Sequence, residues 1–125
     1  MPYSLLKENI KKYVEISNEE LDTICSFFKP QIIKKKEFLL TQGDIYKFEG
    51  FVIEGCFRVF TIDKKGNENV LYFASKDWWV MDIDSFMNQK PSHLNIQALE
   101  DSKILIVNKE DKSDLYKSVP KAEKR

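Results

Sequence analysis

Two adjacent tryptophans, Trp78 and Trp79, precede two acidic residues, Asp82 and Asp84, in the stretch YFASKDWWVMDIDSF. An indole offers a flat apolar surface with one N–H donor, so a tryptophan could form the wall of a pocket for a planar or apolar ligand. A carboxylate could accept a hydrogen bond from a ligand hydroxyl group. Each of these residues also has a structural interpretation.

Neighbouring residues of a strand point to opposite faces. We therefore expect one indole to fill the bottom of the fold, and the other to lie on the surface or against a flanking helix. Two functional alternatives remain. Trp79 could line a ligand pocket, or an exposed tryptophan could anchor a dimer or interdomain contact.

Asp82 and Asp84 suit the start of a helix, where a carboxylate complements the helix dipole. We prefer this interpretation to recognition of a ribose hydroxyl group, which is the functional alternative. A metal site is not expected, because hard cations take about six oxygen ligands and no loop of that density occurs.

The chain offers little for catalysis. His93 is the only histidine, whereas metal-dependent jelly-roll enzymes need several histidines around one ion, and a nucleophilic triad needs a base beside its nucleophile. We expect His93 to be an exposed loop residue and the protein not to be an enzyme. Cys25 and Cys56 lie in apolar runs without C-x-x-C spacing, so we expect reduced cysteines and no cofactor.

Length and charge narrow the class of protein. A chain of 125 residues suits one domain, and 20 basic residues against 20 acidic ones create no global field for nucleic acid or an anionic membrane. The N-terminus lacks a secretory h-region, and no window approaches the roughly 20 apolar residues of a membrane span. We expect a cytoplasmic protein with no membrane contact.

Periodicity predicts helices, then strands, then a helix. Residues 1–30 form a helical flank, in which Ser17 and Glu20 have the spacing of a capping box and Pro30 marks the stop. Residues 31–107 read as short strands separated by turns, typical of an antiparallel sandwich or barrel. Residues 108–125 begin a C-terminal helical region, with Asn108 able to cap. The basic run IIKKKEF suits a solvated sheet edge that discourages pairing, or a phosphate contact.

Four segments carry a resemblance to a known family: QGD at residues 42–44, FVIEGCFRVF at 51–60, DKKGNENVLYFA at 63–74 and IQALEDSKILIVNKED at 96–111. In this order they resemble the cyclic-nucleotide-binding sensor domain of the Crp/Fnr superfamily of bacterial transcription regulators, in a branch common in Bacteroidetes-like genomes. The resemblance implies a mainly β fold, a double-stranded β-helix jelly roll with N-terminal helices and a short C-terminal helix.

In that family a cassette between two strands binds the cyclic nucleotide. A glycine and an arginine meet the phosphate, an acidic residue accepts from the ribose hydroxyl group, and a serine or alanine follows the arginine. The resemblance places Met81 at the glycine, Asp82 at the acid, Ser92 at the arginine and His93 at the serine. Loss of one charge-assisted hydrogen bond costs about 1.5 to 3 kcal/mol. We therefore expect a degenerate cassette without useful affinity for cyclic AMP. The sensing residues it implies are Met81, Asp82, Ile83, Ser92 and His93, with Trp79 as a pocket wall.

The family continues beyond this point into a dimerisation helix and a helix-turn-helix, whereas six residues follow Val119 here. Either the gene is truncated or this is a sensor domain cut from a regulator, and we prefer the second. The full-length protein would be a homodimer that reaches DNA only through the missing C-terminal domain. Its effector would be an unidentified small molecule, or none. The alternatives are a purely structural or dimerisation module, and a genuine cyclic-nucleotide receptor that uses Lys90 or His93 in place of arginine.

Overall fold

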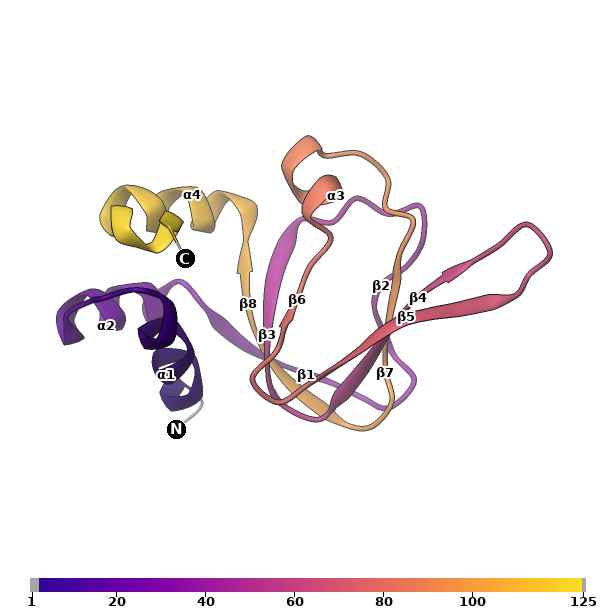
Figure 1. Ribbon diagram of the computed structural model, residues 1–125, viewed down its shortest axis with the longest axis horizontal. Coiled ribbons are helices and arrows are strands. Elements are labelled where there is room, and N and C mark those ends of the chain that lie inside the picture. The colour runs from indigo at the N-terminus through magenta and orange to yellow at the C-terminus, as the bar shows by residue number, and fades with distance from the viewer. Residues whose placement is uncertain (1–2, 125) are drawn as a thin grey trace.

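The computed structural model describes residues 3–124, without the side chains of residues 83, 84, 123 and 124. Two four-stranded antiparallel sheets face one another, and the N-terminal and C-terminal helices lie at one end of the pair (Figure 1). This arrangement confirms the predicted mainly β jelly roll with N-terminal helices and a short C-terminal helix.

The first sheet has the order β1-β8-β3-β6. Its strands are β1 (Lys29–Ile33), β8 (Ser102–Asn108), β3 (Phe48–Glu54) and β6 (Trp79–Val80). Successive residues of its central strands enter two different cores. Phe51 and Leu105 pack with the helices, whereas Val52 and Ile104 pack between the sheets. The central strands of this sheet are therefore covered on both faces.

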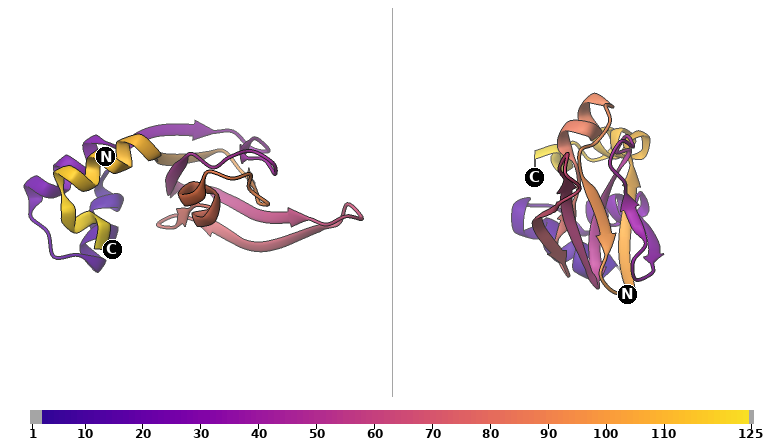
Figure 2. Two further views of the ribbon diagram at one scale, coloured as in Figure 1. Left: turned by 90° about the horizontal axis from the view of Figure 1, so that it is seen from above. Right: turned by 90° about the vertical axis from the view of Figure 1, so that its right-hand side faces the viewer.

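The second sheet has the order β2-β7-β4-β5. Its strands are β2 (Phe38–Leu40), β7 (Asn95–Ala98), β4 (Cys56–Ile62) and β5 (Glu68–Ser75). β4 and β5 form a hairpin with Gly66 in its loop, as predicted, and this hairpin projects away from the helices (Figure 2).

Helices α1 (Tyr3–Tyr13) and α2 (Asn18–Ser26) precede the sheets, and the capping box of Ser17 and Glu20 is confirmed. The strand region begins at Lys29, two residues before the predicted boundary, because Pro30 lies in β1. Proline is tolerated there, since β1 is an edge strand.

Three further helical segments are α3 (Ile83–Asn88), α4 (Lys109–Ser118) and η1 (Pro120–Lys124). The side chain of Asn108 accepts a hydrogen bond from the Asp111 N–H, which confirms the predicted cap of α4. Within residues 3–124, none of the helices has the length and apolar character of a membrane span.

We predict that Gly55→Ala destabilises the fold far more than Gly66→Ala. Both glycines have positive φ, +98° and +86°. A Cβ at Gly55 would lie 2.1 Å from Ser102 Oγ and 2.7 Å from Ser102 Cα, whereas nothing lies within 4 Å at Gly66. Urea unfolding should show a loss of about 3 kcal/mol or more for Gly55→Ala, from strain plus overpacking, and about 1 to 2 kcal/mol for Gly66→Ala. Equal losses would contradict the close packing at Gly55.

Candidate functional site

The candidate site is the segment between β6 and β7, residues 81–93, which we call the cassette. Its helix, α3, has Asp82 as N-cap and ends at Gln89 in the left-handed conformation with φ 52°. The Asp82 carboxylate accepts a hydrogen bond from the Ser85 N–H at 3.2 Å. The structural interpretation of Asp82 as a helix start is thus confirmed.

Asp82 and Ser92, both predicted as site residues, are brought together. The Ser92 hydroxyl donates to the second carboxylate oxygen of Asp82 and accepts from the Leu94 N–H at 3.0 Å. Ser92 is only 2% exposed. Its backbone also pairs with the loop before β3, through the Gly43 N–H at 2.9 Å and the Asp44 carbonyl at 2.8 Å. The cassette is therefore closed on itself by its own side chains.

Ser85 and Tyr46 hold the other end of the cassette, and the sequence pattern did not reveal them. The Ser85 hydroxyl donates to the Lys90 carbonyl at 2.6 Å and accepts from the Tyr46 N–H at 2.8 Å. The Tyr46 hydroxyl donates to the Val80 carbonyl. Both side chains are buried. The only local signal was the position of Ser85 three residues after the cap, where an N–H meets the capping carboxylate.

The remaining predicted residues lie in different surroundings. Met81 is half-buried against the core between the sheets, and His93 is exposed, as predicted. Ile83 begins α3, but its side chain lies outside the described residues. Ligand contact by any of the three stays a prediction.

The two tryptophans take separate roles. Trp79 faces the helices, where its indole N–H donates to Asn9 Oδ1 at 3.0 Å and its ring packs edge-on to Phe28. Trp78 is 48% exposed and stacks on Tyr72. The expectation that one indole fills the bottom of the roll is therefore wrong, and the expectation of an indole against a flanking helix is confirmed. The reason is that β6 turns Trp79 toward the helix-covered face of its sheet.

Trp79 and Met81 line a cavity of about 370 Å³ between α1, the first sheet and α4. Glu49 and Lys112 form an ion pair in its wall, and both side chains are largely buried. The Lys112 ammonium also lies 5.3 Å from the ring centre of Phe86, in α3. This single cation therefore contacts β3 and the cassette helix from α4.

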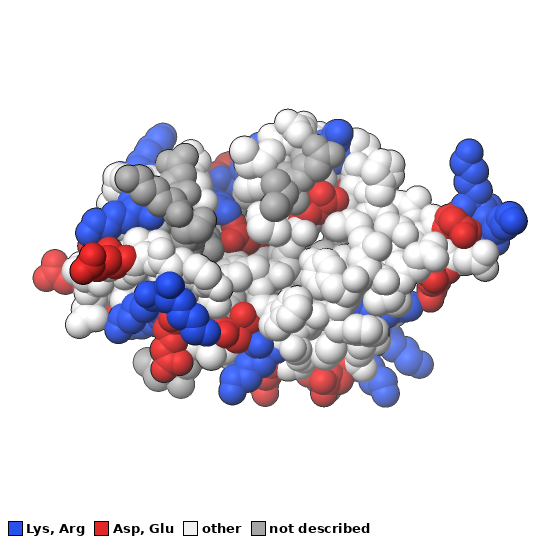
Figure 3. Space-filling view, viewed as in Figure 1, with Lys and Arg blue, Asp and Glu red and all other residues white. Residues whose placement is uncertain are grey.

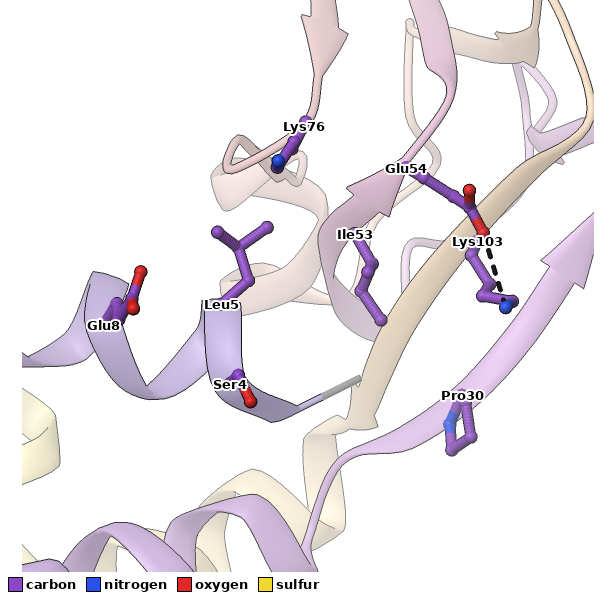
Figure 4. A pocket seen from close by; sticks show the side chains of 8 residues that line it. All are labelled: Ser4, Leu5, Glu8, Pro30, Ile53, Glu54, Lys76 and Lys103. Atoms are coloured by element: carbon purple, nitrogen blue, oxygen red, sulfur yellow. Dashed lines mark ion pairs between the residues drawn. The ribbon is translucent and has the colours of Figure 1, made fainter. Parts of the chain in front are cut away.

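A second cavity, of about 620 Å³, lies away from the cassette, where α1 meets the first sheet (Figure 4). Leu5 and Ile53 give it an apolar floor, and Glu54 pairs with Lys103 at 3.4 Å on its rim. None of the predicted sensing residues lines it.

Among the described side chains of the cassette, the Asp82 carboxylate lies near two tyrosines. Burial raises the pKa of Tyr46 well above its ordinary value, with smaller contributions from Tyr72 and Asp82. Burial also raises the pKa of Tyr72, and the Asp82 charge adds to the effect. Arg58, the one arginine whose side chain is described, instead pairs with Glu68 on the hairpin. The arrangement can donate and accept hydrogen bonds, but it presents no guanidinium to an anion.

The chemistry visible elsewhere is limited. Within the part of the chain that the structure describes, no group of three or more His, Cys, Asp or Glu side chains could hold a metal ion.

Charged side chains gather over the helices and at the hairpin tip, whereas few lie over the roll on the face seen in Figure 3.

A family model for the cyclic nucleotide-binding domain matches residues 30–118. The chain belongs to this family. The matched cyclic nucleotide-binding domain includes both sheets, the cassette and α4. A search among curated proteins finds no significant match.

Solved structures share the fold at low sequence identity. The catabolite activator protein of Thermus thermophilus is 22% identical with a TM-score of 0.79, over 86% of this chain and 50% of that protein. A cyclic nucleotide-binding domain from Methylobacillus flagellatus is 16% identical with a TM-score of 0.85, over 96% and 68% of the two chains. The sensor domain of the regulator DNR from Pseudomonas aeruginosa is 15% identical with a TM-score of 0.77, over 95% and 79%.

These similarities establish a cyclic nucleotide-binding domain with the fold of domains found in transcription regulators. The chain spans half the length of the Thermus protein.

We predict that Asp82→Asn lowers the pKa of Tyr72, because the substitution removes a nearby negative charge that disfavours the tyrosinate. The pKa should stay above the ordinary tyrosine value, since the burial remains. NMR titration of the labelled tyrosine ring measures it. Asp44→Asn, in an exposed loop, is the matched control and should leave the pKa of Tyr72 unchanged. An unchanged pKa in Asp82→Asn would mean that this carboxylate does not face Tyr72.

Proposed function

We propose that this chain is the effector-sensing domain of a Crp/Fnr-type transcription regulator, and that its degenerate cassette does not bind cyclic AMP with useful affinity. The observation that carries the proposal is the set of hydrogen bonds that the Asp82 carboxylate accepts. Both of its carboxylate oxygens accept hydrogen bonds from within the cassette, from the Ser85 N–H and the Ser92 hydroxyl. A carboxylate has about four acceptor sites, so these two bonds do not saturate it, but they hold it toward the cassette, and a ribose hydroxyl would have to share it with both donors.

The position assigned to the phosphate-binding arginine supports the same proposal. Ser92 stands there, and its side chain points to Asp82 rather than to a ligand. A serine cannot supply the bidentate, charged contact of a guanidinium. An anionic phosphate beside the Asp82 carboxylate would therefore lack the compensating guanidinium at this position.

The proposed mechanism is that an effector or partner binds in the roll and repositions α4, which biases a dimer between two states. Lys112 supports this, because it contacts Glu49 of β3 and the ring of Phe86 in the cassette helix. As parts of the proposal, the full-length regulator is a cytoplasmic homodimer that contacts DNA through a segment outside these 125 residues. The role is one of binding, not of catalysis.

The test is a titration with cyclic AMP, cyclic GMP and a cyclic dinucleotide, monitored by the fluorescence of Trp78 and Trp79 and by thermal unfolding. A ligand at a hundredfold excess over its Kd stabilises the native state by about 2.7 kcal/mol. We expect no fluorescence change and no shift in Tm up to millimolar nucleotide.

If a nucleotide does bind, the Asp82→Ala variant tests whether the cassette is its binding site. Asp44→Ala is the matched control. Micromolar binding of a nucleotide that Asp82→Ala abolishes and Asp44→Ala leaves intact would overturn the degenerate cassette. It would establish instead a receptor with a non-standard cassette, the alternative that relies on Lys90 or His93.

A further inference from the structure

The two sheets have four edge strands, and three of them are protected against pairing with another chain. β6 and β2 are short, with two and three residues. β1 contains Pro30 and runs directly into Lys34, Lys35 and Lys36. Shortness, proline and lysine are the usual means by which a sheet edge resists pairing.

β5 lacks these protections. It is eight residues long, and its residues 69–75, NVLYFAS, contain no charged residue and no proline. Val70, Leu71 and Phe73 are 44%, 55% and 54% exposed. Within the described residues β5 pairs with β4 alone. A long, neutral and apolar edge of this kind is a site for addition of another strand.

The register of the sheet determines which backbone groups of β5 point outward. The Leu99 N–H donates to the Cys56 carbonyl at 2.8 Å, so the Cys56 backbone faces β7. The backbone N–H and carbonyl groups of successive residues point to opposite sides of a strand. Phe57 and Val59 therefore face β5, where they oppose Ala74 and Tyr72. It follows that Phe73, between those two, turns its N–H and carbonyl away from β4.

A bulge then reverses this alternation. The register shifts between Val59 and Phe60, which leaves Leu71 without an opposite residue, and Phe60 opposes Val70. Phe60 faces β7, as Arg58 does, so the outward residues beyond the bulge are Val70 and Glu68. The outward backbone groups of β5 are thus arranged symmetrically about a point between residues 71 and 72.

We propose that the free edge of β5 binds β5 of a second copy of this chain, antiparallel and about a two-fold axis between residues 71 and 72. In this register Val70 lies opposite Phe73 of the second copy, and each pair can exchange two backbone hydrogen bonds. The two copies of the second sheet then form one continuous sheet.

The charges of the strand ends agree with this partner. Glu68 begins β5 and Lys76 follows its last residue. Antiparallel pairing brings the acidic end of each strand beside the basic end of the other, and no like charges meet between them. Figure 1 shows the tip of the hairpin on the side opposite α1, α2 and α4. The interface does not depend on the proposed sensing function.

Sedimentation velocity at rising concentrations tests the association. We expect a monomer–dimer equilibrium. Phe73→Lys places two lysines in the interface and should raise the dissociation constant by about tenfold or more, which corresponds to about 1.4 kcal/mol per factor of ten. Ile62→Lys is the matched control, since Ile62 is 40% exposed but lies on β4, and should leave association unchanged. Thermal unfolding confirms that both variants fold.

Cysteine cross-linking in a Cys56→Ser background tests the register. Opposed Cα atoms of a hydrogen-bonded antiparallel pair are about 5.5 Å apart, within the range of a disulfide. A mixture of Val70→Cys and Phe73→Cys proteins should therefore form a disulfide-linked dimer. Each variant alone should not, because identical positions lie about 10 Å apart in this register.

Two results would overturn the proposal. One is a monomer at every concentration. The other is a dimer that Phe73→Lys does not weaken, or in which the mixed cysteine variants cross-link no better than each variant alone.

Discussion

The structure depends on the burial of the central strands of the first sheet from both sides. β3 and β8 lie at the centre of this sheet, so each must place apolar side chains on both faces. Phe51 and Leu105 meet the helices, whereas Val52 and Ile104 meet the opposite sheet. Apolar contact on both faces fixes the register of these strands, since a slip of one residue would exchange the two faces. The helices, the second sheet and the cassette are all arranged around this layer.

Much of the fold could be predicted because its signals are local. The capping box at Ser17 and Glu20 and the cap at Asn108 involve residues three apart, so sequence spacing alone reveals them. The same holds for the hairpin around Gly66. The place of Trp79 could not be predicted, because its partner Asn9 lies 70 residues away. Alternation along a strand predicts that Trp78 and Trp79 separate, but not which surface receives each.

In the cassette, too, local features could be predicted from the sequence and contacts between distant residues could not. Its acidic position follows from the family pattern, and the helix start at Asp82 follows from the sequence. The bond from Ser92 to Asp82 does not, since it depends on how α3 and the loop after it fold back and on the pairing of Ser92 with Gly43 and Asp44. The absence of the arginine is an expectation from the family resemblance. The structure adds that Ser92, the residue assigned to its position, donates a hydrogen bond to Asp82.

The ion pair between Glu49 and Lys112 limits how α4 can move. Two largely buried charges stabilise the fold only while they stay together, and a partner left alone in the interior costs about 3 to 5 kcal/mol. A small rotation of α4 would separate the two charges and incur most of that cost without exposing either charge to water. We therefore expect α4 to have two positions, one docked with the ion pair intact and one in which both charges are hydrated. Few intermediate positions should be populated, so α4 should move in a two-state manner and not gradually.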